Sequence, residues 1–179
     1  MKADADRLVG KTASITNAGL VLILLVTAMM VAWPRVTSAL GMRRTPAPAY
    51  RAGQTIDTPA DWYASSNYTL VVFARASCGA CQTARPFLKE LVADLGSKSA
   101  IVLGTTGKEP KEELGYGQSL GLADASVKVA PAGLRVRATP TLVLVDQHGQ
   151  VLAAWEGVGP DKQQQLIKQT IESMVADNK

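Results

Sequence analysis

The sequence contains very few of the residues that bind metals or stack against nucleic-acid bases. Only two of its 179 residues are cysteines, one is a histidine, and aromatic residues make up 5% of the composition. A structural zinc site typically uses four ligands, more than the two cysteines and His148 supply together. The few aromatic residues are not interleaved with basic ones, as is common on nucleic-acid-binding surfaces. We therefore expect no metal site and no nucleic-acid binding.

The excess of positive charge is confined to one end of the chain. The net charge is +4; residues 1–44 carry six basic and two acidic side chains, whereas residues 45–179 carry 13 of each. A balanced charge gives no reason to expect an anionic partner for the larger part of the chain. That part contains no nucleotide, flavin or metal motif either.

One long run near the N-terminus has no charged side chain. Residues 15–33 read ITNAGLVLILLVTAMMVAW, and at about 1.5 Å per residue such a helix approaches the thickness of a bilayer's hydrocarbon core. We expect residues 1–14 to be a cytoplasmic tail and residues 15–33 to be a membrane anchor, which places the rest of the chain on the periplasmic side. A cleaved signal peptide is the alternative, because residues 37–39, Thr-Ser-Ala, form a small-residue cleavage site.

Two further regions follow the apolar run. Residues 34–53 include the stretch TPAPAYRAG, whose proline and alanine content predicts an extended tether. Residues 54–179 are enough for one domain with its own hydrophobic core. We expect this single domain to carry the function.

The last region alternates predicted strands with predicted helices. Hydrophobic runs predict strands at residues 68–73, 101–103, 141–145 and 150–155. Apolar residues spaced by three and four predict a helix from Gly79 to about Gly96, and a last helix from Asp161 with Leu166, Ile167, Ile171, Met174 and Val175 on one face. Residues 109–120 are compatible with a short helix. This order predicts an α/β fold with a mixed sheet and helices on both sides.

Both cysteines lie within four residues, Cys78-Gly79-Ala80-Cys81, where the first strand meets the first helix. The unpaired N–H groups and the dipole at a helix N-terminus stabilise a thiolate. We therefore expect Cys78 to be the exposed nucleophile and Cys81, one turn further along, to be the shielded resolving thiol. A structural disulfide and half of a metal site are the alternatives, although a bridge across so short a loop would add little stability.

Four features together resemble the thioredoxin family. They are the Cys78–Cys81 motif after a hydrophobic strand, Pro86 in the following helix, Thr139-Pro140 before a buried strand, and Gly157. With its anchor and tether, the chain is similar to the membrane-anchored extracytoplasmic thiol-disulfide oxidoreductases, which include the reductases of cytochrome c maturation. The resemblance implies a thioredoxin-like fold from about Tyr68 to Val175.

The proline before the third strand also has a physical interpretation. A proline cannot donate a hydrogen bond within a central strand, and a cis bond between Thr139 and Pro140 at the strand's edge resolves this conflict. A trans proline that caps an edge strand is the alternative. The resemblance implies that Pro140 packs against the cysteine pair and leaves no space for a metal. It also implies that the Thr139 backbone pairs with a substrate peptide and that Gly157 lies beside the substrate groove.

The resemblance further implies the reaction and the partners. The redox group would be the Cys78–Cys81 disulfide, with no other cofactor, and the substrates would be protein thiols and disulfides. A membrane thiol donor protein would supply the electrons, and the protein would be a monomer. We expect a reductase of extracytoplasmic protein disulfides. A disulfide oxidase or isomerase, with the same residues at a higher potential, is the first alternative.

The residues around the cysteines depart from the family pattern. Ser77 replaces the tryptophan that usually precedes the first cysteine, and it is a candidate helix cap. Val72 stands where many members keep a buried acid that helps to deprotonate the resolving cysteine, so no proton acceptor is identified. Arg75 is a candidate for stabilising the thiolate. The uncharged Gly79-Ala80 pair indicates a potential nearer to that of thioredoxin, on the order of −270 mV, than to that of the strong oxidants.

Three other classes are further alternatives. A redox-inactive binding or scaffold module would keep the fold without using the thiols. A copper-handling protein would need His148 close to Cys78. A thiol peroxidase is disfavoured because no threonine lies three residues before Cys78. Residues 105–136 resemble an insertion of the anchored branch, which bears on the choice of partner.

Overall fold

The computed structural model describes residues 22, 23, 25–30, 49–96 and 98–176. The chain divides into two units, residues 1–46 and residues 47–179. In the first unit, residues 22, 23 and 25–30 are helical, and their large apolar side chains are exposed. None of the helices within the described ranges combines the length and the hydropathy that a membrane crossing requires. The predicted tail, the rest of the predicted anchor and the predicted tether up to residue 48 lie outside these ranges.

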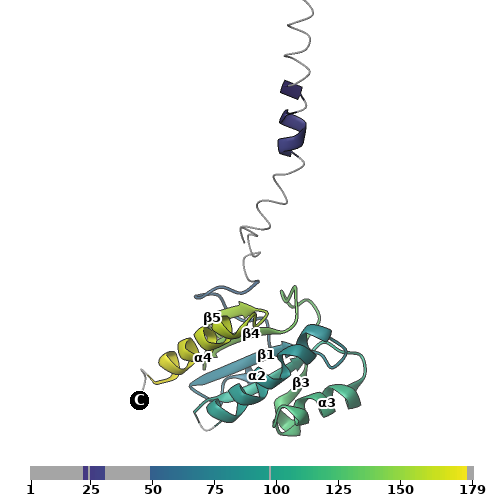
Figure 1. The fold of residues 1–179 in the computed structure, drawn as a ribbon. Coiled ribbons are helices and arrows are strands. Elements are labelled where there is room, and N and C mark those ends of the chain that lie inside the picture. Colours follow the sequence, from purple (N-terminus) through teal and green to yellow (C-terminus); the bar gives the residue numbers. More distant parts are fainter. Residues whose placement is uncertain (1–21, 24, 31–48, 97, 177–179) are drawn as a thin grey trace, which may run out of the picture. The chain divides into compact units, whose positions relative to one another are not determined.

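The second unit is built around a mixed five-stranded sheet with the strand order β3-β2-β1-β4-β5 (Figure 1). The strands are β1 (Tyr68–Ala74), β2 (Ala100–Thr105), β3 (Val127–Val129), β4 (Thr141–Asp146) and β5 (Val151–Glu156). β2 runs parallel to β1 and β3, whereas β4 runs antiparallel to β1 and β5. The mixed sheet and the four strands predicted from the hydrophobic runs are confirmed.

β1 is the central strand and separates two hydrophobic core clusters. Leu70, Val72 and Ala74 face one cluster, and Val71 and Phe73 face the other. A strand can carry apolar residues at every position when both of its faces are buried. This is why a continuous apolar run forms β1, and the carboxyl end of the strand delivers the chain to the cysteine motif.

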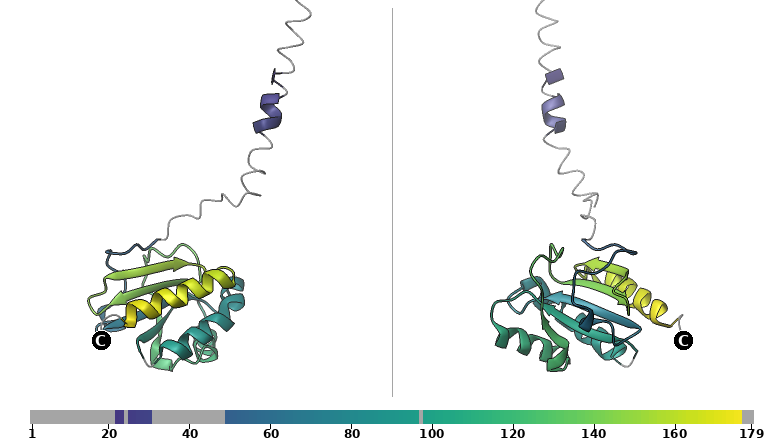
Figure 2. Two further views of the ribbon diagram at one scale, coloured as in Figure 1. Left: turned by 60° about the vertical axis from the view of Figure 1, so that its left-hand side comes forward. Right: turned by 180° about the vertical axis from the view of Figure 1, so that it is seen from behind.

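Three α-helices of the second unit cover one face of this sheet. They are α2 (Gly79–Leu95), α3 (Pro110–Ser119) and α4 (Asp161–Ala176). Buried side chains of α2 and α4, with Tyr116 of α3, belong to the core cluster of Leu70 and Val72. Figure 2 shows α2 and α4 side by side on this face. The opposite face is covered by residues 49–63, which include the short 3-10 helix η1 (Ala60–Trp62).

The prediction of helices on both sides of the sheet is therefore wrong for the described α-helices. The strand order shows why: the crossovers β1-α2-β2 and β2-α3-β3 step in the same direction along the sheet. Right-handed crossovers that step in one direction place their helices on one face. The sequence did not predict β3, a strand of only three residues, none of them buried, so the second crossover was not foreseen.

The N-terminal segment of the second unit belongs to the folded core. Tyr50 is 1% exposed, and its ring stacks on Phe73 of β1 with 6.3 Å between the centroids. The Gly53 N–H donates a hydrogen bond of 2.8 Å to the Val151 carbonyl at the start of β5. The predicted tether, residues 34–53, is therefore wrong at its C-terminal end. The composition of this stretch, rich in proline and alanine, predicted an extended chain. It did not indicate that Tyr50 is buried in the hydrophobic core.

One residue of the last helix also needs correction. The sequence pattern places Leu166 on the buried face, but it is 56% exposed. The buried stripe of α4 consists of Ile167, Ile171 and Val175, which are spaced by four. Leu166 is rotated by about 100° around the helix from Ile167, which is enough to leave this narrow stripe.

Candidate active site

Cys78 lies where β1 leads into α2. It is the N-cap residue of α2, with φ −86° and ψ 116°, and its Sγ accepts a hydrogen bond of 3.3 Å from the Cys81 N–H. The sulfur thus takes the place of the side-chain oxygen that commonly caps a helix. The interpretation of Ser77 as the cap is wrong, because Cys78 occupies the N-cap position and Ser77 is exposed beside it.

The two thiols differ in accessibility. Both cysteines are free, Cys78 is half-buried, and Cys81 is 0% exposed. Cys81 packs in the same core cluster as Ala84 and Leu88 of α2, since residues spaced by three and four share a helix face. The predicted contrast between an accessible and a shielded cysteine is confirmed.

The loop before β4 faces Cys78. The Thr139–Pro140 peptide bond is cis, as predicted, and the trans alternative is excluded. The Thr139 hydroxyl donates to Cys78 Sγ at 3.3 Å, and the Cys78 thiol donates to the Thr139 carbonyl at 3.4 Å. The Pro140 carbonyl accepts a hydrogen bond of 2.7 Å from the Gly157 N–H. The structure therefore places Thr139 against Cys78, and Gly157 next to Pro140.

The environment separates the pKa values of the two thiols. Burial disfavours the Cys78 thiolate, but hydrogen bonds from the Cys81 and Thr139 side chains and from the Cys81 and Ala80 N–H groups outweigh it. Together they lower the pKa of Cys78 to about 7. Burial and the hydrogen bond to Cys78 raise the pKa of Cys81 to about 11. One thiol is thus an accessible thiolate near neutral pH, while the other stays protonated.

This difference predicts a pH profile of alkylation in the reduced protein. The rate at Cys78 is expected to rise with pH through a midpoint near 7, since the thiolate reacts and the thiol does not. Cys81 should react only at a much higher pH, because its pKa is raised to about 11. Iodoacetamide labelling between pH 5 and 10, with peptide mass analysis, measures both sites, and a Cys81→Ser variant assigns the first step to Cys78. Equal labelling of the two thiols at every pH would contradict the assignment.

The residues between and before the cysteines leave Cys78 open to a large substrate. Gly79 and Ala80 are exposed, and a Cβ placed on Gly79 would meet no described atom within 4 Å beyond its chain neighbours and the adjoining backbone of α2. The Arg75 carbonyl accepts a hydrogen bond of 3.2 Å from the Cys78 N–H, while the Arg75 side chain is exposed. Pro86 lies inside α2, as expected.

His148 lies away from the cysteines. The cysteine end of β1 is paired with Thr141, at the start of β4, whereas His148 follows the far end of β4. The His148 N–H donates to Asp146 Oδ1 at 2.9 Å, and the residue is exposed in the β4–β5 turn. The copper site that would require His148 beside Cys78 is therefore excluded.

Two residues of α3 contact the cysteine region and were not predicted. Glu113 is 3% exposed and accepts a hydrogen bond of 3.0 Å from the Ala76 N–H. The Tyr116 hydroxyl donates to the Cys81 carbonyl at 3.0 Å. The available signal was an acidic residue three positions before a tyrosine, which places both on one helix face.

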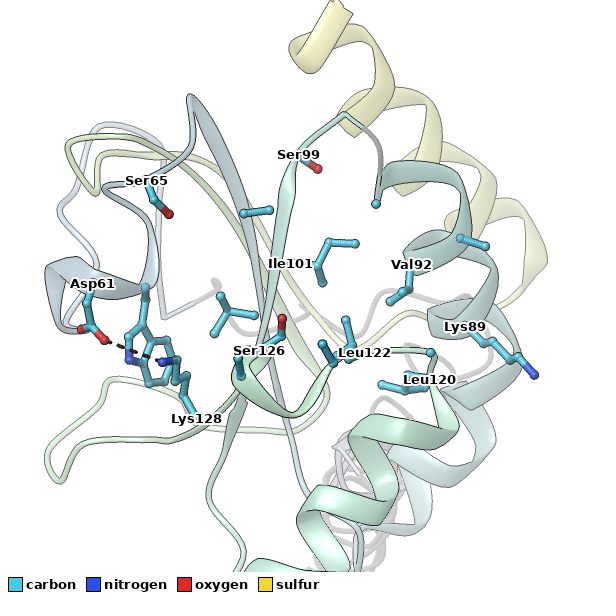
Figure 3. A pocket seen from close by; sticks show the side chains of 18 residues that line it. Asp61, Ser65, Lys89, Val92, Ser99, Ile101, Leu120, Leu122, Ser126 and Lys128 are labelled. Carbon is cyan, nitrogen blue, oxygen red and sulfur yellow. Dashed lines mark ion pairs between the residues drawn. The ribbon is translucent and has the colours of Figure 1, made fainter.

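The structure also has a hollow of about 580 Å³ beside the first half of β2. Figure 3 shows Ile101 of β2, Val92 of α2 and Leu122 around it. Asp61 and Lys128 form an ion pair of 3.8 Å at its rim. None of its lining residues belongs to the cysteine motif or to the Thr139–Pro140 loop, so the hollow is separate from the thiol site.

Comparison with known proteins identifies the fold. No family model and no curated protein matches the sequence. Among solved structures, the chain is similar to a protein from Chlorobium tepidum described as a thiol:disulfide interchange protein DsbE. The TM-score is 0.52 at 19% identity, over 72% of this chain and 96% of that one. A protein from Bacteroides thetaiotaomicron, described as a protein disulfide isomerase, gives 0.53 at 16% identity, over 70% and 90%.

A third structure agrees with these two. A protein from Neisseria meningitidis, described as a thioredoxin, gives a TM-score of 0.51 at 19% identity, over 74% of this chain and 93% of that one. The chain has the thioredoxin-like fold, with a mixed sheet and a cysteine pair at the N-terminus of α2. At these identities the similarity establishes the fold alone, and the function has to be argued from the site.

Proposed function

We propose that the protein is a thiol-disulfide oxidoreductase that reduces disulfides of other proteins. One observation carries the proposal, namely that the two thiols are unequal. Cys78 is accessible at a helix N-terminus and its pKa is lowered to about 7, whereas Cys81 is buried and stays protonated at neutral pH. A structural disulfide would not need unequal thiols. A nucleophile with a resolving partner does.

The reaction proceeds by two exchanges of sulfur–sulfur bonds. The Cys78 thiolate attacks one sulfur of the substrate disulfide, forms a mixed disulfide and releases the other substrate sulfur as a thiolate. Cys81 then loses its proton and attacks Cys78 Sγ, which releases the second substrate thiolate. Two electrons have passed to the substrate, which ends as a dithiol, and the protein ends with a Cys78–Cys81 disulfide. A second dithiol must reduce this bond before the next cycle.

The direction of electron flow is inferred from the modest stabilisation of the thiolate. A strongly lowered pKa of the first cysteine stabilises the reduced form and makes an oxidant, as in DsbA with a pKa of about 3.5, whereas thioredoxin's lies at about 7. Cys78 matches the second case. This supports a reductase rather than an oxidase.

The proposed location and partners are based on the N-terminal region. The described part of the predicted anchor, residues 22, 23 and 25–30, is helical with exposed apolar side chains, which suits a lipid environment. An anchored domain outside the cytoplasm would meet oxidised proteins and would receive electrons from a membrane thiol donor protein. Reduction of apocytochrome c disulfides is one such task, proposed from the family resemblance.

The redox potential of the pair tests this function. In residues 47–179, a compact unit with both core clusters, we expect a potential on the order of −270 mV, measured against glutathione or dithiothreitol buffers. A Cys81→Ser variant is the control, since it lacks the transition. A potential above about −170 mV would turn the assignment to an oxidase or isomerase. A pair that exchanges with neither buffer would favour the scaffold interpretation.

A further inference from the structure

Helix α3 reaches the cysteine motif with two side chains that lie one turn apart. It belongs to residues 105–136, the segment whose pattern predicted least. Glu113 contacts the chain before Cys78, and Tyr116 contacts Cys81. Neither residue is adjacent in sequence to the motif, so α3 holds the motif from a separate element.

The Glu113 carboxyl is held on several sides. Its two oxygens accept hydrogen bonds of 3.0 and 3.1 Å from the Ala76 N–H, two residues before Cys78. The Thr105 hydroxyl at the end of β2 donates to Oε2 at 2.5 Å. A Cβ at Gly107 would lie 1.7 Å from Oε1, so only glycine fits there without displacing the carboxyl. A buried carboxyl with so many contacts fixes the position of the Ala76 backbone.

The Tyr116 hydroxyl fixes the other end of the motif. It donates to the Cys81 carbonyl at 3.0 Å in a buried environment. Burial raises the pKa of Tyr116 above its usual value, so the hydroxyl remains a donor over the working pH range. The two contacts bracket the residues from Ala76 to Cys81.

We propose that Glu113 and Tyr116 are positioning residues that hold the Ala76–Cys81 loop in the geometry in which Cys78 Sγ receives its hydrogen bonds. The inference rests on the proposed function and deepens it. Cys78 Sγ receives a backbone donor at 3.3 Å and the Thr139 hydroxyl at 3.3 Å, and both distances depend on where the loop lies. If the loop moves, these donors are lost first, because hydrogen bonds weaken steeply with distance and angle.

Charge and position can be separated by experiment. In the described structure, Cys78 interacts with Cys81 on α2 and with Tyr116 on α3, and Tyr116 in turn interacts with Arg85 of α2 and Glu113 of α3. Removing a nearby negative charge would by itself favour the Cys78 thiolate. Losing the contacts that fix the Ala76–Cys81 loop would disfavour the Cys78 thiolate. The two effects therefore have opposite signs.

The experiment measures the pH profile of Cys78 alkylation in the whole chain, purified in detergent, for a set of variants. In Glu113→Ala the pKa of Cys78 is expected to rise, and its alkylation at pH 6.5 to fall by about fivefold. Glu113→Gln keeps an oxygen that accepts from Ala76, so its rate should stay within about twofold of the original. Tyr116→Phe should reduce the rate by about twofold.

A second variant displaces the carboxyl without removing it. Gly107→Ala places a methyl group against Glu113 and is expected to lower alkylation in the same direction as Glu113→Ala. It keeps the proposal testable if Glu113→Ala does not fold. The matched control is Tyr50→Phe, which removes the hydroxyl of a buried tyrosine in the other core cluster and should leave the Cys78 profile unchanged.

Two results would overturn the proposal. One is an unchanged profile in both Glu113→Ala and Gly107→Ala with lower thermal stability, which would make α3 a purely structural support. The other is faster alkylation in Glu113→Gln and Glu113→Ala alike, which would mean that charge dominates. Alkylation needs no protein substrate, so these results remain readable even if the chain proves unable to reduce disulfides. An inability to reduce disulfides would instead appear in the redox titration.

Discussion

Replacement of Cys78 by serine is expected to lower the rate of disulfide exchange by about three orders of magnitude or more. A serine hydroxyl stays protonated at neutral pH, whereas the Cys78 thiol is about half ionised there because its pKa is about 7. At the N-cap of α2 the half-buried Cys78 is the one sulfur of the pair that a substrate can reach, since Cys81 is buried. Reduction of a small protein disulfide, followed by turbidity or mass analysis, measures the loss.

The companion variant, Cys81→Ser, is expected to behave differently. It retains the attacking thiolate but cannot resolve the intermediate, so mixed disulfides between Cys78 and its substrates should accumulate on non-reducing gels. His148→Ala, in the turn at the far end of β4, is the control and should leave exchange unchanged. If Cys78→Ser kept the original rate, or if Cys81→Ser turned over without trapped species, the two-step reaction would be wrong.

Truncation of Tyr50 to alanine is expected to lower the free energy of unfolding by about 3 kcal/mol. The ring is 1% exposed, stacks on Phe73, and lies under the Arg135 guanidinium at 5.0 Å. Removing it leaves a cavity beside the central strand that the surrounding residues fill only partly. Urea unfolding of residues 47–179, with and without the substitution, measures the difference.

The control for this effect is Tyr50→Phe. It keeps the ring and loses only the hydroxyl, which donates to Asp57 Oδ2 at 3.4 Å, so a cost of about 1 kcal/mol or less is expected. If residues up to 53 formed a tether, as their composition predicted, Tyr50→Ala would cost nothing. That result would also remove the argument for starting a soluble fragment at residue 47 rather than after Tyr50.

The parts of the site that could be predicted are those in which a residue stands out against the sequence immediately around it. Cys78 and Cys81 follow a strand that is apolar at every position, so their place at the helix N-terminus follows from sequence alone. Pro140 precedes a buried strand where a proline is out of place, which pointed to the cis bond. In both cases the local sequence and the tertiary structure agree.

The parts that could not be predicted depend on partners far along the chain. Glu113 contacts Ala76, 37 residues away, and nothing in a single sequence pairs these two positions. The sequence showed that Val72 replaces the buried acid of many family members, so the proton acceptor for Cys81 stayed unidentified. It gave no reason to search α3 for a buried carboxyl. β3 was missed for a related reason, since three partly exposed residues form a strand only because β2 offers an edge.

The pairing of residues 53–56 with the start of β5 also bears on self-association. Thr55 pairs with Gln150, and Gly53 and Gln54 bond to Val151, so part of that sheet edge is already occupied by the chain itself. The opposite edge, β3, is only three residues long. Short or covered edges give a neighbouring copy little backbone to pair with. Domains at a high local concentration would therefore resist edge-to-edge aggregation without needing a partner to keep them apart.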